Sequence, residues 1–292
     1  ASSTRVLVTS VVRDCYSGRR MARVMSLAQM IFFVSPILAP SLGSLLLLLG
    51  PWRWNFWALG AMGALIASWT TLRLPETLHP EDRRPISIAS LTAAYRMTLG
   101  SRFSLGYTLA QALLFGALLG YINSSEQIVA GVFHRPSAFP FAFAGIALAM
   151  GLSTFANSRL VERYGTRKLS HGALLSVIVV GALHFAVASS GAETLVSFIL
   201  LQALQMSAFG LIGSNFSSMA MEPVGHIAGT ASSIQGFVST VGGATIGIVI
   251  GQAFDGTTVP IATGFTLAGL AALGIVLVTE GGRLFVARNP QV

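Results

Sequence analysis

Residues 194–221 read TLVSFILLQALQMSAFGLIGSNFSSMAM, a run of 28 residues without Asp, Glu, Lys or Arg. As an α-helix this run would be about 42 Å long, more than the roughly 30 Å of hydrocarbon in a bilayer. Seven further charge-free runs of at least 19 residues lie at 24–52, 54–72, 103–125, 136–158, 169–192, 223–254 and 256–279. The sequence therefore predicts an all-α protein that crosses a membrane repeatedly.

The composition excludes several classes of protein. Hydrophobic residues make up 53% of the chain and charged residues only 10%, whereas an ordinary soluble domain is about 25% charged. A soluble enzyme and a disordered chain are excluded, and the long apolar runs exclude an outer-membrane β-barrel. The single Cys15 excludes an intramolecular disulfide and a multi-cysteine metal site. No metal set, phosphate-binding loop or nucleophile–base pair is visible, so we expect neither an enzyme nor a bound cofactor.

The basic residues predict the orientation. If each run crosses once, 15 of the 18 Lys and Arg residues fall on one side and two on the other. Because basic residues accumulate in cytoplasmic loops, the C-terminus is predicted to be cytoplasmic. The net charge of +8 is then an orientation signal, and no nucleic-acid partner is expected. Helices are expected at 24–49, 54–73, 103–123, 138–157, 169–190, 194–218, 228–252 and 260–280, after half a helix at 1–12.

The largest polar segment, 74–101, contains LPETLHPEDRRP and an amphipathic stretch at 88–99. Its Pro and charge content favours a linker between two helical bundles. The predicted organisation is therefore the remainder of a first bundle at 1–73, a cytoplasmic linker at 74–101, a six-helix bundle at 102–282 and a cytoplasmic tail at 283–292.

One predicted cytoplasmic loop carries a motif. Residues 158–168 read SRLVERYGTRK, which resembles the loop motif G-x-x-x-D-R-x-G-R-R/K of the major facilitator superfamily. Glycine permits the tight turn, and the acid can meet a helix N-terminus. Ser158 and Glu162 replace the first Gly and the Asp of the motif, and Thr166 replaces one basic residue. The matching or substituted residues taken as conformational candidates are Glu162, Arg163, Gly165 and Arg167.

Two predicted helices carry small residues at regular spacing, and one of them also carries prolines. SPILAPSLGS at 35–44 is similar to the antiporter motif of the fifth superfamily helix, in which Pro36, Pro40 and Gly43 would bend the helix and form a moving seal; a packing kink without a gating role is the alternative. In the helix at 228–252, a G-x-x-x-G-x-x-x-G stripe predicts close approach of a partner helix. Its glycines are Gly243, Gly247 and Gly251.

A faint repeat relates the entries of two helices. Asp14 is followed by small residues, and Glu222 is followed by a similar series, at equivalent places in a two-bundle transporter. The segments 11–26 and 221–237 and the PW-R-x-x-FW pattern ending at Trp57 resemble the bicyclomycin-resistance (Bcr/CflA) branch of drug:proton antiporters. This resemblance implies a major facilitator fold of two six-helix bundles in a bacterial inner membrane. The chain would hold part of helix 4 and helices 5–12, with the start of the protein missing.

Charged and polar residues inside predicted helices are candidates for the transport pathway. Arg5 would lie about 12 Å deeper than Arg13 if the segment is helical, where it would bind an anionic group or pair with an acid. Glu126 would lie at the outer mouth, as a ligand for a cationic drug or a proton or as an ordinary interfacial carboxylate. The uncharged candidates lie on helices that line the cavity in the family, and for each of them an interhelical hydrogen bond is the alternative role: Gln111, Tyr121, Asn123, Gln205 and Asn215. His171 and His184, on one helix, are candidates for a proton relay; the alternative is an interfacial His171 and a buried His184 whose hydrogen bonds are satisfied.

These observations predict a monomeric secondary transporter that exports drugs or amphipathic small molecules by alternating access, driven by a proton gradient and surrounded by membrane lipids. Three alternatives remain open. The same fold would also suit a sugar, an amino acid or another metabolite as cargo, and a channel or an intramembrane enzyme would be a different class of protein.

Overall fold

The structure is a computed structural model, and it describes residues 11, 39, 42–75 and 88–286. Contacts within the chain divide it into two units, one ending at Ile86 and one beginning at Ser87. In the first unit, residues 42–49 are helical and α3 spans Arg53–Arg73. This helix ends two residues before Pro75 because the residue before a proline is disfavoured in the α conformation. The predicted helix at 54–73 is therefore present, whereas most of the helix expected at 24–49 lies outside the described residues.

The second unit consists of helices. They are α4 (Ile88–Gly100), α5 (Arg102–Gln127), the π-helical turn η2 (Ile128–Val132), the 3₁₀ turn η3 (Pro136–Ala138), α6 (Phe139–Tyr164), α7 (Thr166–Ser189), α8 (Leu195–Met221), the 3₁₀ turn η4 (Glu222–Ile227), α9 (Ala228–Gln252) and α10 (Val259–Glu280). Among the described residues, six helices are long and apolar enough to cross a membrane, and these begin with α5 and end with α10. The prediction of an all-α membrane protein is confirmed. α3 is not among the six, because its Trp, Asn and Thr residues lower its hydropathy.

The predicted ends of the helices are the least accurate part of the prediction. The helix expected at 138–157 continues to Tyr164, so that Arg159, Glu162 and Arg163 are helical. Charge marks where a helix can leave the hydrocarbon, but it does not end the helix. The turn comes at Gly165, whose φ of +79° a residue with a side chain rarely adopts. At the start of α8, Thr194 and Ser197 form a capping box, which satisfies the first backbone N–H groups.

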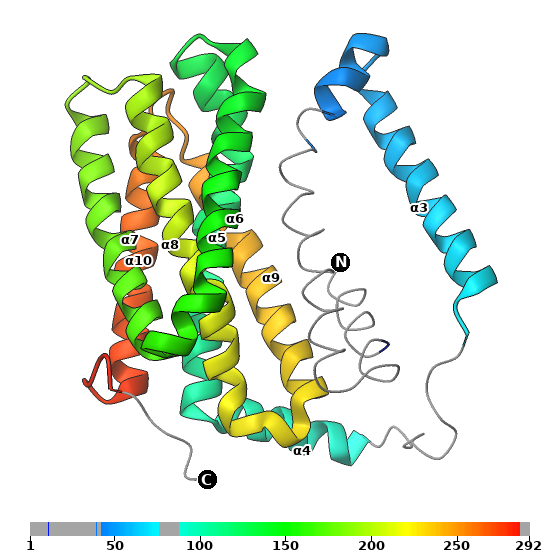
Figure 1. The fold of residues 1–292 in the computed structure, drawn as a ribbon, viewed down its shortest axis with the longest axis vertical. Coiled ribbons are helices and arrows are strands. Elements are labelled where there is room, and N and C mark those ends of the chain that lie inside the picture. The colour runs from blue at the N-terminus through cyan, green and yellow to red at the C-terminus, as the bar shows by residue number, and fades with distance from the viewer. Residues whose placement is uncertain (1–10, 12–38, 40–41, 76–87, 287–292) are drawn as a thin grey trace. The chain divides into compact units, whose positions relative to one another are not determined.

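The six long helices run alternately up and down (Figure 1). α5, α7 and α9 begin at the same end of the bundle at which α6, α8 and α10 finish, which we call the Arg167 end; the opposite end is the Glu193 end. α8 contacts α5, α6 and α7, and α5 also contacts α9 and α10. α4 lies across the Arg167 end, against α5, η4 and α9 (Figure 1).

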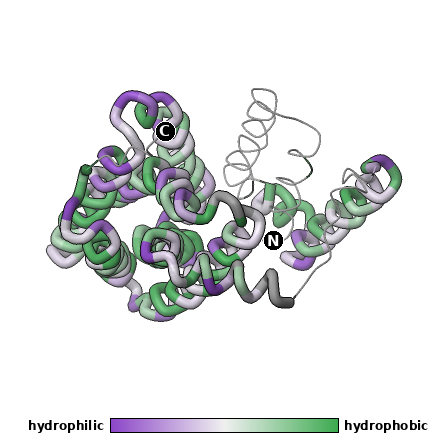
Figure 2. Tube along the Cα trace, turned by 90° about the horizontal axis from the view of Figure 1, so that it is seen from below, coloured by the Kyte–Doolittle hydropathy of each residue, from purple (hydrophilic) through white to green (hydrophobic). Residues whose placement is uncertain are grey.

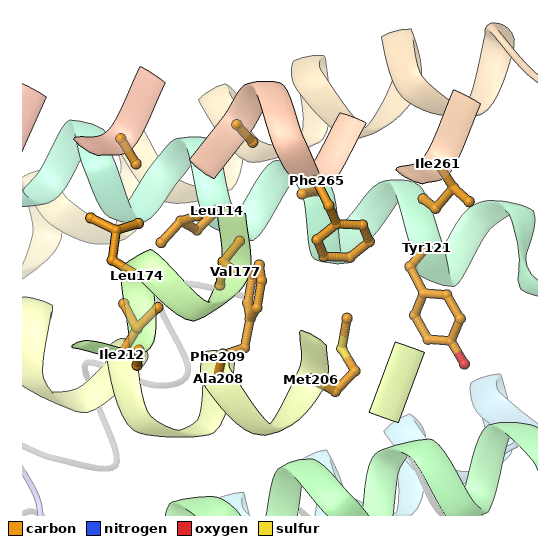
Figure 3. Close-up of a cluster of buried hydrophobic side chains, with 14 of the residues drawn as sticks. Leu114, Tyr121, Leu174, Val177, Met206, Ala208, Phe209, Ile212, Ile261 and Phe265 are labelled. Atoms are coloured by element: carbon orange, nitrogen blue, oxygen red, sulfur yellow. The ribbon is translucent and has the colours of Figure 1, made fainter. Parts of the chain in front are cut away.

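The core lies between α5, α7, α8 and α10 (Figure 3). Leu114 and Tyr121 enter it from α5, Val177 from α7, Phe209 from α8 and Phe265 from α10. Hydrophobic residues also cover the outside of these helices, while hydrophilic residues gather at the turns (Figure 2). This distribution suits a bundle surrounded by lipid, because lipid is as apolar as the core.

Candidate functional site

A buried cluster of charged residues joins three helices at the Arg167 end. Arg167, in the first turn of α7, is 5% exposed and donates to two acids. Its Nε lies 2.9 Å from Oε1 of Glu280, the last residue of α10. Its Nη2 lies 2.8 Å from Oε2 of Glu222, which follows α8. One guanidinium therefore connects the ends of α7, α8 and α10, and its planar fork suits this paired contact.

Tyr107, His171 and the tail extend this cluster. The Tyr107 hydroxyl donates to Glu280 Oε1 at 2.6 Å, so its oxygen can accept from His171 Nε2 at 3.1 Å. The backbone N–H of Phe285 donates to His171 Nδ1 at 3.1 Å. These three bonds are satisfied together when His171 is neutral and carries its proton on Nε2. The imidazole therefore joins α5, α7 and the segment after α10.

The structure thus pairs the motif arginine with Glu222, which the sequence analysis had singled out, and with Glu280, which it had not. Arg163 is exposed with its guanidinium over the Tyr164 ring, and Glu162 is exposed. Glu280 carried one sequence signal, since it ends the charge-free run 256–279. Tyr107 carried none, because a tyrosine within an apolar helix is usually a packing residue.

A second feature is a glycine contact between α5 and α9. A Cβ built on Gly247 would lie 2.7 Å from Leu119 Cβ and 3.3 Å from the backbone oxygen of Gly116. A Cβ built on Gly116 would in turn lie 3.2 Å from the backbone oxygen of Gly243. At Gly251 the nearest atoms are 3.7 Å away or more. The stripe predicted from sequence therefore faces α5, and close backbone approach requires glycine on both helices.

A polar contact joins α6 to α8. Asn157 Nδ2 donates to Ser214 Oγ at 3.0 Å, and Asn215 Nδ2 donates to Asn157 Oδ1 at 2.9 Å. Gly210 lets the two helices approach, because a Cβ there would lie 2.6 Å from the backbone oxygen of Met150. Asn215 is thus held by an interhelical hydrogen bond and is 3% exposed.

The structure does not bring the predicted pathway residues together in one site. Asn123 and Glu126 are exposed near the end of α5, and Gln111 is half-buried. Tyr121 is buried and stacked on a phenylalanine of α6, with ring centroids 5.8 Å apart. Gln205 is fully buried, away from Asn215 on the same helix. Helical spacing therefore identified shared faces but not which neighbour each face meets.

The remaining candidates are partly outside the described residues. Arg5, Asp14, Pro36 and Pro40 lie outside them. Gly43 is described, and a Cβ there would make an ordinary 3.6 Å contact with Asn55 Oδ1. Among the described residues, no group of three or more His, Cys, Asp and Glu side chains is placed to hold a metal ion.

Six helices of membrane-spanning length define a multi-pass α-helical membrane protein. The family model described as "Major Facilitator Superfamily" matches residues 1–247. The chain therefore belongs to the major facilitator superfamily, which is a family of transporters, and the resemblance inferred from its loop motif is confirmed.

Individual relatives agree with this assignment. The chain is 29% identical to the uncharacterized MFS-type transporter YdgK of Bacillus subtilis, over 86% of this chain and 63% of YdgK. It is 25% identical to the bicyclomycin resistance protein homolog of Haemophilus influenzae, over 93% of this chain and 68% of that protein. It is 31% identical to the multidrug resistance protein MdtL of Citrobacter koseri, over 81% of this chain and 59% of MdtL. The chain spans 58–68% of the length of the first three relatives.

Proposed function

We propose that the protein is a secondary transporter that exports drugs or other amphipathic small molecules in exchange for protons. The observation that carries this proposal is the family membership, together with relatives named for bicyclomycin and multidrug resistance. The protein acts without an enzymatic step and without a bound cofactor, and the proton gradient supplies the energy. It works as a monomer among lipids, with a small molecule as its partner.

The proposed location is the inner membrane of a bacterium. The basic segment around Gly165, with Arg163 at the end of α6 and Arg167 at the start of α7, faces the cytoplasm, and so does the C-terminal tail, because basic residues favour that side. The Arg167 end is then the cytoplasmic end, and the Glu193 end faces outward. The chain forms the linker and C-terminal bundle of the transporter, and residues 1–73 belong to its N-terminal bundle.

The contacts within the second unit suggest how it would move. The Arg167 cluster ties α7, α8 and α10 at one end, so these helices move as one body during alternating access. The glycine contact locks α5 and α9 together, because side chains of each helix fill the space beside glycines of the other: Ile246 and Ile250 lie against Gly116 and Gly120, and Phe115 and Leu119 lie against Gly243 and Gly247. These two helices would therefore move as a pair. Glu126 and Gln111 are both accessible on α5 and lie 15 residues apart. We assign Gln111 to the wall of the pathway and Glu126 to its outer mouth.

Accumulation of fluorescent dyes in whole cells tests this function. The reading frame that contains this chain, with any residues that precede it, is expressed in a bacterium lacking its main efflux pumps. We expect lower accumulation of cationic and neutral amphipathic dyes, abolished by a protonophore. A purified protein that moves only sugars or amino acids would replace the proposed cargo with a metabolite. The Glu126→Gln variant should lose export of cations more than of neutral compounds, whereas Asp255→Asn, an exposed acid in the turn before α10, should change neither.

A further inference from the structure

A buried acid and a histidine meet at the Glu193 end. His184 of α7 is fully buried, and its Nε2 lies 2.8 Å from Oε1 of Glu193, whose side chain is 6% exposed. The other carboxylate oxygen of Glu193 accepts a hydrogen bond from the hydroxyl of Thr258, which precedes α10. The contact joins the end of α7, the start of α8 and the start of α10. Nothing in the Arg167 cluster or the α6–α8 contact involves these residues.

Buried polar atoms continue from this pair into the bundle. His184 Nδ1 and both amide atoms of Gln202 and Gln205 have no hydrogen-bond partner in the part of the chain that the structure describes, and all three residues are fully buried. The His184 ring packs edge-on against Phe198 of α8, with centroids 5.7 Å apart. Gln202 follows Phe198 by four residues, so it lies one helical turn further along the same face.

Gln205 lies on this face as well. A Cβ built on Gly181 of α7 would be 3.1 Å from Gln205 Nε2 and 2.7 Å from Thr266 Oγ1. Gly181 precedes His184 by three residues, so the α7 face that carries the imidazole also faces the second amide. We name Glu193, His184, Gln202 and Gln205 the polar column. It extends between α7 and α8 from the Glu193 end toward the middle of the bundle.

We propose that the polar column is a proton-binding site of the transporter, in which His184 and Glu193 hold the proton and the two amides hold the water molecules that deliver it. A buried polar atom without a partner is costly, and buried polar groups of this kind bind water in proteins. An imidazole nitrogen and two amides offer acceptors and donors at successive positions. Water between them completes their hydrogen bonds and forms a path for a proton.

The charges of the pair explain why it would bind one proton. Before the extra proton binds, His184 carries its one hydrogen on Nε2 and donates it to the Glu193 carboxylate. Nδ1 then carries no hydrogen, and the pair has a net charge of −1. A proton taken from water binds Nδ1 and gives an imidazolium–carboxylate pair of zero net charge; the reverse step returns it to water. Glu193 is the titratable residue that the described structure brings against His184, while α8 contributes Phe198 and α10 contributes Thr258 through the carboxylate. The proton therefore belongs to the pair as a unit.

This site would influence transport through α8. That helix carries Gln202 and Gln205 on one face and contacts α5 and α6 elsewhere. A change of one buried charge at its start alters how firmly α7, α8 and α10 are held together. This inference rests on the proposed function, in which protons enter from the outside. It assigns the binding of one coupling proton to residues of this chain.

The test compares drug export and proton movement in the same vesicles. The full reading frame is studied in everted membrane vesicles, with ethidium as the drug and a pH-sensitive dye as the proton probe. In the wild-type protein, ethidium should dissipate the pH gradient. His184→Gln and Glu193→Gln should retain ethidium binding but reduce ethidium-driven proton movement at least tenfold. Asp255→Asn is the matched control, because this acid is exposed and, within the described part of the chain, accepts its hydrogen bonds from Thr257 of its own turn.

Two outcomes separate this inference from the proposed function. Wild-type vesicles in which ethidium moves no protons would refute proton-coupled export itself. Wild-type coupling that persists in both variants would overturn the polar column and leave the export function standing. The pH dependence of ethidium binding to the purified protein is a second measurement, and it does not require transport. One linked proton changes the ethidium Kd by up to tenfold per pH unit, and this dependence should vanish in both variants and remain in Asp255→Asn.

A further variant covers the possibility that loss of the pair prevents folding. Gln205→Met keeps the side chain's length and removes a buried amide that bonds to no protein group among the described residues, so no protein group loses a hydrogen bond. It leaves His184 and Glu193 in place, so folding and ethidium binding should be normal. Proton movement should nevertheless slow severalfold because the water path is broken. An unchanged rate in a well-folded Gln205→Met protein would contradict the assigned path.

Discussion

The two acids that hold Arg167 should differ greatly in their effect on stability. Glu280 and Glu222 each face the same guanidinium at 2.8–2.9 Å. Their side chains differ in exposure, which is 1% for Glu280 and 46% for Glu222. Replacing each by Gln keeps the shape of the side chain and removes its charge. The two variants together therefore measure how burial changes the contribution of an ion pair to the free energy of unfolding.

The expected magnitudes follow from this difference. Removing one member of a buried ion pair costs about 3–5 kcal/mol, because the remaining charge is left in a low dielectric. Glu280→Gln should lower the free energy of unfolding by about 3 kcal/mol, near the low end because the amide oxygen can still accept from Arg167 and Tyr107. Water screens Glu222, and pairs of that kind contribute about 0.2–1 kcal/mol. Glu222→Gln should therefore cost less than about 1 kcal/mol.

Unfolding in mixed micelles, followed by circular dichroism, measures both values. Tryptophan fluorescence is unsuitable, since all four tryptophans lie between positions 52 and 69, outside the second unit. Glu162→Gln, which changes an exposed acid near the end of α6, provides the baseline. Equal losses for the two cluster acids, or a larger loss for Glu222→Gln, would refute the view that burial sets the energy of this cluster.

Three further outcomes are expected. Gly247→Ala should destabilise the bundle by about 1–3 kcal/mol, because its new methyl group would lie 2.7 Å from Leu119 Cβ of α5, whereas Gly251→Ala should be nearly neutral; thermal unfolding of both variants checks this. Tyr107→Phe should cost about 1–3 kcal/mol in the same assay, since it leaves a buried carboxylate with one hydrogen bond fewer. Hydrogen bonds from Thr257 lower the pKa of Asp255, so any stability this carboxylate adds is present above the ordinary Asp pKa of about 3.9 and is lost as pH falls through the lower folded value. Thr257→Val should raise that pKa in an NMR titration, and an unchanged value would contradict the assigned bonds.

Several elements of the site could be predicted from sequence because they depend on local chemistry. The stripe of Gly243, Gly247 and Gly251 identified a face of close approach. On α5, Gly116 and Gly120 are also four residues apart. Matching these two stripes would have suggested the α5–α9 contact. The motif in 158–168 likewise identified a charged loop whose turn requires glycine.

Other elements could not be predicted because they join distant residues. Nothing in the sequence links Arg167 to Glu280, which lie 113 residues apart. The helical spacing of Gln205 and Asn215 suggested a common role, yet Asn215 meets α6 while Gln205 faces α7. Spacing fixes the angle between two side chains on one helix, but not the helix that each will meet.

The sequence by itself determined the class of protein and its family. The six charge-free runs that form α5 to α10 require helices in a membrane, because backbone N–H and C=O groups in lipid must be bonded within each segment. Only the tertiary structure decided which polar residues are buried together. His184 and Glu193, like Arg167 and Glu280, acquire their partners when helices pack side by side. That arrangement depends on the shapes of whole helix faces, which no local pattern records.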